Sequence, residues 1–150
     1  MKRGDNLPNI KMTEEEMKYI AFFESITGVT VIDCILDREK NRLIFLVKKG
    51  YVGKAVGKNG INIKRLNKLT GKNIEVVEYS EKIDGLIKNS LFPATVQSIR
   101  LSKNINGKKV VYVSVPPKEK GLAIGKEGRN ISRAILILKR YFDIEHIILQ

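Results

Sequence analysis

The chain has 150 residues and a formal net charge of +12, with 28 lysines and arginines against 16 aspartates and glutamates. A charge of this sign and size favours a polyanionic partner, nucleic acid before an anionic membrane surface. No apolar run could span a bilayer and residues 1–12 lack the apolar stretch of a signal peptide, so we expect a cytoplasmic protein with no membrane partner.

The first half of the chain predicts a helix, two strands, a glycine loop between helices, and a third strand. Thr13 and Glu16 form a capping-box pattern that starts a helix, and Gly28 ends it. Runs of β-branched and aliphatic residues predict the strands. The remaining expected elements are strands over 29–36, 42–47 and 73–79, a short helical turn over 49–55, a loop over 57–60 and a helix over 60–70.

The second half predicts the same elements in the same order. A helix is expected over 80–92, closed by Pro93, and Asn106-Gly107 is a strong hairpin signal between two strands. The strands are expected over 94–101, 109–115 and 143–149, with a turn over 116–123, a loop over 125–128 and a helix over 129–142.

The clearest feature is an internal repeat. Residues 53–69 align with residues 121–137 without a gap, at a constant offset of 68 from Gly53 to Gly121. The identical pairs are Gly53/Gly121, Gly57/Gly125, Lys58/Lys126, Gly60/Gly128, Asn62/Asn130, Ile63/Ile131 and Arg65/Arg133, and Val56 matches Ile124. The chain therefore contains two copies of one structural unit.

The repeated loop, Gly-x-x-Gly with a lysine after its first glycine, has the chemistry of an anion site. The helix that follows presents unpaired N–H groups and its positive dipole end to the loop, and glycines allow an anion to approach the backbone closely. The alternative is that Gly-x-x-Gly only makes a tight turn between two helices. Two copies with the same flanks, in a basic protein, favour a phosphate or a phosphodiester backbone as the ligand.

Catalytic and metal-binding patterns are absent from the sequence. A P-loop needs four residues between its first glycine and its Gly-Lys, followed by Ser or Thr, whereas GKAVGK and GLAIGK have three and continue with Asn59 or Glu127. Cys34 and His146 are the only cysteine and histidine, which is too few for a zinc site or a disulfide. We therefore expect Cys34 to be packed, and the protein to be a non-enzyme without cofactor, metal or small-molecule substrate.

The stretches VGKNGINIKRL and IGKEGRNISRA resemble the signature of the KH domain, and the strands and first helix that precede each loop resemble its type II form. The resemblance implies an α+β fold of two tandem KH type II domains, each a three-stranded sheet with three helices packed on one face. The implied boundaries are a flexible segment over 1–12, a first domain over 13–80 and a second over 81–150. With no linker rich in Gly, Pro or Ser between the domains, we expect them to dock rigidly.

The resemblance also implies how the chain binds. A KH domain clamps about four nucleotides of a single strand, with the backbone over the Gly-x-x-Gly loop. The residues that match the family's contact positions in the first domain are Gly53, Lys54, Val56, Gly57, Lys58, Asn59, Gly60, Lys64 and Arg65. Those in the second are Gly121, Ile124, Gly125, Lys126, Glu127, Gly128, Arg129 and Arg133.

The two loops differ in one charge, Asn59 in the first against Glu127 in the second. An exposed carboxylate beside a phosphodiester costs about 1 kcal/mol, which Arg129 would partly offset. We therefore expect the first loop to be the stronger phosphate clamp.

A tandem type II pair in a short basic chain is similar to the KH portion of the NusA transcription factors, and the chain's length resembles the short archaeal NusA-like proteins. The resemblance implies single-stranded RNA as partner and a role in transcription termination or antitermination through nascent RNA. RNA polymerase and other transcription factors are further candidate partners. The alternatives are a ribosomal or ribosome-biogenesis factor that binds ribosomal RNA, and the RNA-recognition module of a larger RNA-processing enzyme.

Overall fold

The structure is a computed structural model that describes residues 12–150, so that nearly all of the segment expected to be flexible lies outside the described residues. The chain divides into two compact units, one ending at Ser80 (unit 1) and one covering Glu81–Gln150 (unit 2). Unit 1 contains α1 (Glu14–Thr27), β1 (Val31–Asp37), β2 (Arg42–Val47), α2 (Val52–Val56), α3 (Ile61–Thr70) and β3 (Asn73–Glu78). Unit 2 contains α4 (Ile83–Leu91), β4 (Ser98–Lys103), β5 (Lys109–Ser114), α5 (Lys120–Ile124), α6 (Arg129–Phe142) and β6 (His146–Leu149).

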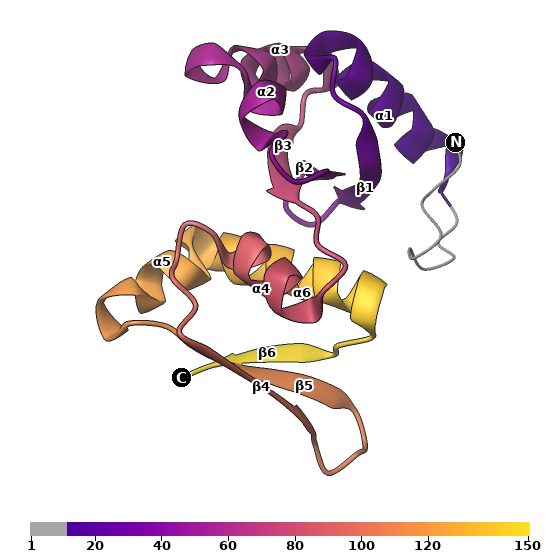
Figure 1. Ribbon diagram of the computed structural model, residues 1–150. Helices are drawn as coiled ribbons and strands as arrows, with labels where there is room; N and C mark the ends of the chain where they lie inside the picture. The colour runs from indigo at the N-terminus through magenta and orange to yellow at the C-terminus, as the bar shows by residue number, and fades with distance from the viewer. Residues whose placement is uncertain (1–11) are drawn as a thin grey trace. The chain divides into compact units, whose positions relative to one another are not determined.

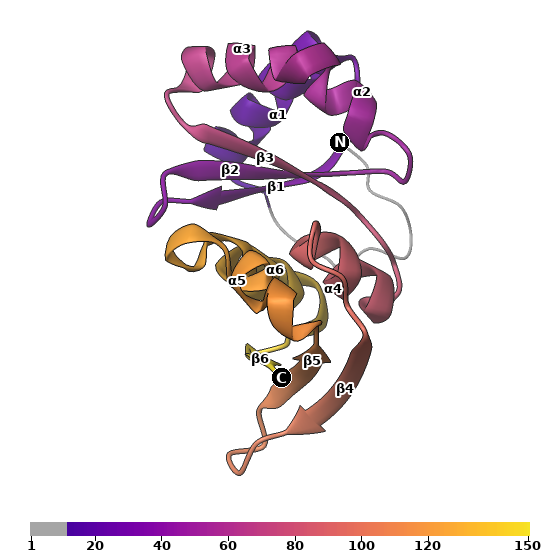
Figure 2. The ribbon, with the colours of Figure 1, turned by 90° about the vertical axis from the view of Figure 1, so that its left-hand side faces the viewer.

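Each unit has one three-stranded sheet with the same topology. In unit 1 the order is β1-β2-β3, with β1 antiparallel and β3 parallel to the central strand. Unit 2 repeats this as β4-β5-β6. The helices of each unit cover one face of its own sheet (Figures 1 and 2). The predicted α+β fold of tandem type II units is confirmed.

The ends of α1 follow the expected capping chemistry. The Thr13 hydroxyl accepts the Glu16 N–H at 3.1 Å, and the Glu16 carboxylate accepts the Thr13 N–H at 2.9 Å. At the other end Gly28 has φ 71° and donates its N–H to the Glu24 carbonyl at 2.9 Å. Both ends of this helix are therefore fixed by local sequence.

Strand β4 begins later than the sequence predicts, at Ser98 instead of residue 94. The Ala94 N–H bonds to the Leu91 carbonyl, and the Thr95 N–H bonds to the Glu119 carboxylate at 2.9 Å. These contacts occupy the backbone donors that would otherwise join the ladder. The strand also runs two residues further than expected, to Lys103.

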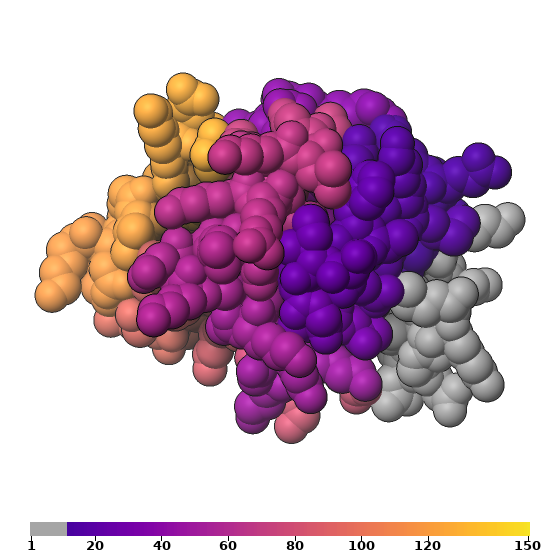
Figure 3. Space-filling view, turned by 90° about the horizontal axis from the view of Figure 1, so that it is seen from above, coloured from indigo at the N-terminus to yellow at the C-terminus, as the bar shows by residue number. Residues whose placement is uncertain are grey.

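The core of unit 1 lies between its sheet and its helices. Phe23 of α1 stacks on Phe45 of β2 with ring centroids 4.2 Å apart, and Leu66 of α3 is fully buried beside them. Figure 3 looks onto the outer surface of α1 and α3, which cover this core. In unit 2 the matching layer is built from Leu86, Val111, Val113 and Ile137. Cys34 is buried in the unit 1 core, as expected.

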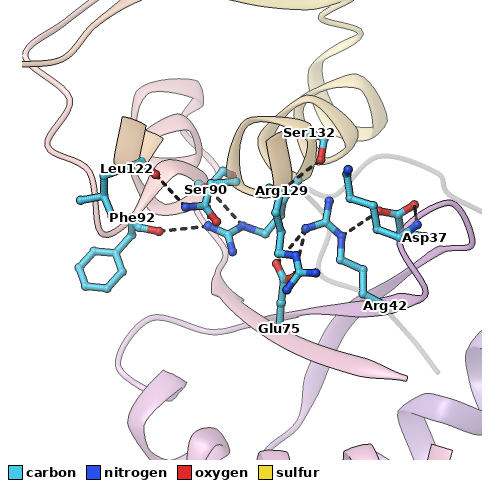
Figure 4. A network of polar contacts seen from close by, with 11 residues as sticks. Asp37, Arg42, Glu75, Ser90, Phe92, Leu122, Arg129 and Ser132 are labelled. Carbon is cyan, nitrogen blue, oxygen red and sulfur yellow. Dashed lines mark hydrogen bonds and ion pairs between the residues drawn. The ribbon is translucent and has the colours of Figure 1, made fainter. Parts of the chain in front are cut away.

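One buried ionic group ties the three strands of unit 1 together. The Arg42 guanidinium lies 2.8 Å from the Asp37 carboxylate and 3.1 Å from that of Glu75, as Figure 4 shows. Each of the three residues belongs to a different strand of the sheet. Val110 takes the same ladder position in unit 2, opposite the first residue of the third strand. The ionic group is thus specific to unit 1, and sequence analysis did not identify it.

Replacing Leu66 with alanine tests the packing that supports the helix after the first loop. Leu66 is fully buried, so we expect Leu66→Ala to lower the free energy of unfolding by about 2–5 kcal/mol. Leu69 on the same helix is 54% exposed and supplies the matched control, because Leu69→Ala leaves no cavity. Urea denaturation of both variants measures the difference. Equal losses would contradict the packing described here.

Candidate nucleic-acid interface

The two Gly-x-x-Gly loops have the same backbone conformation. Gly57 has φ 81° and ψ 166°, and Gly125 has φ 77° and ψ 168°. Gly60 and Gly128 both have φ 72°. In each loop the last glycine donates its N–H to the carbonyl of the first, at 3.0 and 3.1 Å. The sequence repeat is therefore a repeat of one rigid turn.

The first glycine of each loop is required by the protein itself. Its dihedral angles lie in a region that is accessible almost only to glycine. A Cβ added at Gly57 would lie 2.9 Å from the Asn62 amide nitrogen, and one added at Gly125 would lie 2.8 Å from the Asn130 backbone nitrogen. Both backbone strain and steric overlap exclude a larger residue.

Asn62 and Asn130 lock the loops, a role that sequence analysis missed. The Asn62 side-chain amide donates to the Lys54 carbonyl at 3.3 Å, and that of Asn130 donates to the Leu122 carbonyl at 2.8 Å. Each bond joins the helix after the loop to the helix before it. The sequence did contain a signal for this role, because both units have an asparagine two residues after the second glycine of the loop.

The second glycine of each loop is the N-cap of a longer helix. Gly60 precedes α3 and Gly128 precedes α6, and neither helix has a side-chain cap from the residues that the structure describes. The first N–H groups of α3 and α6 therefore face the loop, where the positive end of each helix dipole favours an anion. This geometry suits the oxygens of a phosphodiester.

Gly53 and Gly121 have a different status. Neither has a positive φ, and a Cβ at either position would meet nothing within 4 Å. Glycine inside a helix costs roughly 0.5–1 kcal/mol relative to alanine, so the protein's own packing does not explain it. The lack of a side chain instead leaves an open patch on α2 and on α5, which a ligand can approach closely.

The residues around these patches differ between the units. In unit 1 the expected cations Lys54, Lys58, Lys64 and Arg65 are all exposed. In unit 2 Lys126 is exposed while Arg129 and Arg133 are half-buried. Leu122 takes the place of Lys54 and is 43% exposed, next to Ile124 at 42%. Val56, the counterpart of Ile124, is half-buried. Beside its loop, unit 1 thus presents more exposed cations and unit 2 more apolar surface.

The middle of each loop places a non-glycine residue in the left-handed region. Asn59 has φ 57° and ψ 25°, and Glu127 has φ 57° and ψ 29°. Asparagine tolerates this region better than most residues, whereas glutamate gains nothing from it. Both side chains are exposed on the loop, so that the charge difference lies where the phosphate would bind.

Arg133 binds the end of a neighbouring helix. Its guanidinium donates to the Ser90 carbonyl at 2.9 Å and to the Phe92 carbonyl at 3.1 Å. The two accepting residues are labelled in Figure 4. Helix α4 ends just before Pro93, which has no N–H with which to cap those carbonyls. In unit 1 the residue after α1 is Gly28, which does have an N–H and donates it to a carbonyl of that helix. Arg65, the counterpart of Arg133, is exposed. A contact between Arg133 and nucleic acid stays a prediction, and it competes with this cap.

The described residues contain no cluster of three or more His, Cys, Asp or Glu side chains that could hold a metal ion. His146 is exposed at the start of β6. No helix within residues 12–150 is both long enough and apolar enough to cross a bilayer.

Comparison with known proteins agrees with the repeat. A KH-domain family model matches residues 17–115, and a model of the NusA-like second KH domain matches residues 83–150. The probable transcription termination protein NusA of Methanocaldococcus jannaschii is 35% identical over 141 residues, which are 94% of this chain and 75% of that protein. The protein of the same name from Methanococcus vannielii is 39% identical over 92% of this chain and 78% of its own length. The crystal structure of APE1850 is 46% identical with a TM-score of 0.85, and the match covers 93% of this chain and 100% of that one.

The first glycine of the loop and the glycine within α2 are predicted to affect stability in different ways. Gly57→Ala forces a Cβ into a strained backbone against Asn62, and should lower the free energy of unfolding by about 1–3 kcal/mol. Gly53→Ala adds a methyl group into open space, and should leave stability unchanged or raise it by up to about 1 kcal/mol. Thermal unfolding followed by circular dichroism measures both. A loss of stability in Gly53→Ala as large as that in Gly57→Ala would show that the α2 glycine is structural.

Proposed function

The chain belongs to the NusA-like family of KH-domain proteins, and we propose that it binds single-stranded RNA with both of its Gly-x-x-Gly loops. Members of this family are RNA-binding factors and not enzymes, so the protein is a non-enzymatic one. The proposed biological role is transcription termination or antitermination through contacts with nascent RNA. The relatives' names support this role over ribosomal RNA binding or a module of a processing enzyme.

One observation carries the proposal: the two units keep the same loop conformation, with glycines at α2 and α5 that the protein's own packing does not require. A phosphodiester would lie across residues 57–60 and 125–128, where helix N–H groups and exposed lysines meet it. The glycine patches would let the sugar–phosphate chain or a base approach the helix before each loop. A free anion such as phosphate would need the loop but not this second patch.

The bases would lie on the apolar surface beside each loop. In unit 2 this surface is formed by Ile124 and the neighbouring Leu122. In unit 1 Val56 has the corresponding position, and Ile63 packs against the core of its unit, which supports a core role for that residue. Such shallow aliphatic surfaces give little base discrimination by hydrogen bonding, so we expect modest sequence preference.

The proposed role of two units is to lengthen the contact. Each KH unit takes about four nucleotides, so that a pair would take about eight. Only residues 79–82 separate β3 from α4, which restricts how far the two loops can move apart. A short connection raises the effective concentration of the second loop once the first is bound. RNA polymerase is a further proposed partner, by analogy with the transcription factors of this family.

Unequal loops predict unequal effects of matched substitutions. Gly60→Asp and Gly128→Asp each place a carboxylate at the same point of the same turn. Because the second loop already contains Glu127, its phosphate contact is the weaker one, and we expect Gly60→Asp to cost at least about fivefold more affinity for single-stranded RNA. Fluorescence anisotropy with a labelled oligonucleotide measures this difference.

A second pair of variants checks the cause of that asymmetry. Glu127→Asn should raise affinity, because it removes the carboxylate and restores the residue of the first loop. Glu39→Gln makes the same change in net charge on an exposed turn, and it is expected to change affinity less. Equal losses from the two glycine variants, or a larger loss at Gly128, would rule out the first loop as the stronger clamp.

A further inference from the structure

Unit 2 contains an apolar pocket that has no part in the proposed RNA contact. Its volume is about 500 Å³, and its lining residues come from the far end of the β4–β5 hairpin, the start of α4 and the end of α6. Figure 1 shows that this end of the hairpin extends beyond the helices of its unit. Leu101 is 53% exposed there, although it is on the face of the sheet that packs against the helices. The pocket is lined by Ile83, Leu101, Ser102, Lys103, Lys109, Phe142 and Ile144.

The same place in unit 1 is filled. Leu36 and Leu43 are ladder partners in unit 1, and Leu101 and Val111 are ladder partners in unit 2. Leu43 corresponds to Val111 in the repeat, so Leu36 corresponds to Leu101. Leu36 packs against the core of unit 1 and is half-buried, in contrast to Leu101. One ladder position is therefore covered in unit 1 and open in unit 2.

Helix length explains the difference. Thr27 and Ser90 both lie in the last turn of their helices, and the hydroxyl of each bonds to the carbonyl four residues earlier, at 2.8 and 2.6 Å, so we align α1 and α4 at these two residues. Counted back from these points, Ile83 at the start of α4 corresponds to Ile20 of α1. Helix α1 has 14 residues and α4 has nine, so that the residues over 14–19 have no helical counterpart in unit 2.

The additional turns of α1 show what kind of segment covers this place. They are amphipathic, with Tyr19 and the preceding Met12 packed against the core. They are also acidic, with Glu14, Glu15 and Glu16 in the first turn. The Glu15 carboxylate lies 2.9 Å from the Arg38 guanidinium, which belongs to the turn of the β1–β2 hairpin. In unit 1 the acidic end of α1 is thus joined to the hairpin turn by an ion pair with one arginine.

The hairpin of unit 2 is basic at the matching point. Lys103 and Lys109 are direct cross-strand partners, and both line the pocket. Like charges opposite each other destabilise a ladder, and an anion at the rim would relieve the repulsion. Acidic residues lie on the α6 side of the pocket, where Asp143 is exposed and Glu145 is 3.9 Å from Lys139. Acidic groups of a bound ligand would therefore lie on the hairpin side of the pocket, near the two lysines and away from Asp143 and Glu145.

We infer that this pocket binds an acidic amphipathic helix of a partner protein, which covers Leu101 as the first turns of α1 cover Leu36. The apolar face of the partner helix would contact Ile83, Phe142 and Ile144, and its carboxylates would contact Lys103 and Lys109. This is a helix-in-groove contact. A single-stranded RNA fits it poorly, because most of its apolar lining is aliphatic and Phe142 is the only aromatic side chain in that lining on which a base could stack. The inference does not depend on RNA binding.

The test uses a synthetic peptide with the sequence of residues 12–27 as a model acidic helix, added to the full chain labelled at its Ile and Leu methyl groups. We expect NMR shifts that saturate, confined in unit 2 to Ile83, Leu101 and Ile144. A control peptide with Glu14 and Glu15 replaced by lysine keeps the apolar face and the Thr13/Glu16 capping box, and it should bind at least about fivefold more weakly. Binding of the first peptide should weaken as salt is raised.

A variant of the protein makes the result specific. Leu101→Ser changes a half-exposed residue near the end of a strand, so the fold should persist, as circular dichroism can verify. This variant should lose peptide binding while keeping the affinity of the wild type for RNA. The inference is overturned if the acidic peptide causes no shifts up to about 1 mM, which corresponds to the weakest useful affinities. It is also overturned if the control peptide binds equally well, or if the shifts map to unit 1.

Discussion

The structure depends on a backbone conformation that almost only glycine adopts. At Gly57 and Gly125, φ near 80° combines with an extended ψ, and the space where a Cβ would stand is taken by the asparagine that follows the loop. This one turn sets the angle between α2 and α3 in unit 1 and between α5 and α6 in unit 2. It also places the N-terminus of the longer helix, with the positive end of its dipole, at the loop. The proposed anion site and the fold of each unit therefore depend on the same turn.

Much of this architecture follows from local sequence. The capping pair Thr13/Glu16, the stop at Gly28 and the β-branched runs predict the order of elements, because each acts within a few residues. The parts that could not be predicted depend on contacts between distant segments. Glu119 delays β4 by binding the Thr95 N–H, and Arg133 caps a helix that ends more than 40 residues earlier. The asparagines that lock the loops were visible as a repeat, but their bonds form only once the turn has closed.

Duplication has kept the loop and changed its surroundings. Unit 1 has a long acid-capped helix, a buried ionic group at Arg42 and exposed cations beside its loop. Unit 2 has a shorter first helix, apolar Leu122 and Ile124 beside its loop, and an open pocket under its hairpin. Because the backbone angles of the two loops agree, the proposed phosphate contact would have the same geometry in both units. The proposed division of work follows from these surroundings: exposed cations beside the loop in unit 1, and apolar surface for other contacts in unit 2.

The central claim is that both loops contact the backbone of a single RNA strand, and amide NMR tests it most directly. An unstructured RNA of about eight nucleotides, two KH footprints long, is titrated into the labelled full chain. The account predicts that the largest shifts fall on the amides of residues 57–61 and 125–129, at the same RNA concentration in both units. It is contradicted if those amides stay in place while others move, or if RNA causes no shifts at low salt, where backbone contacts are strongest.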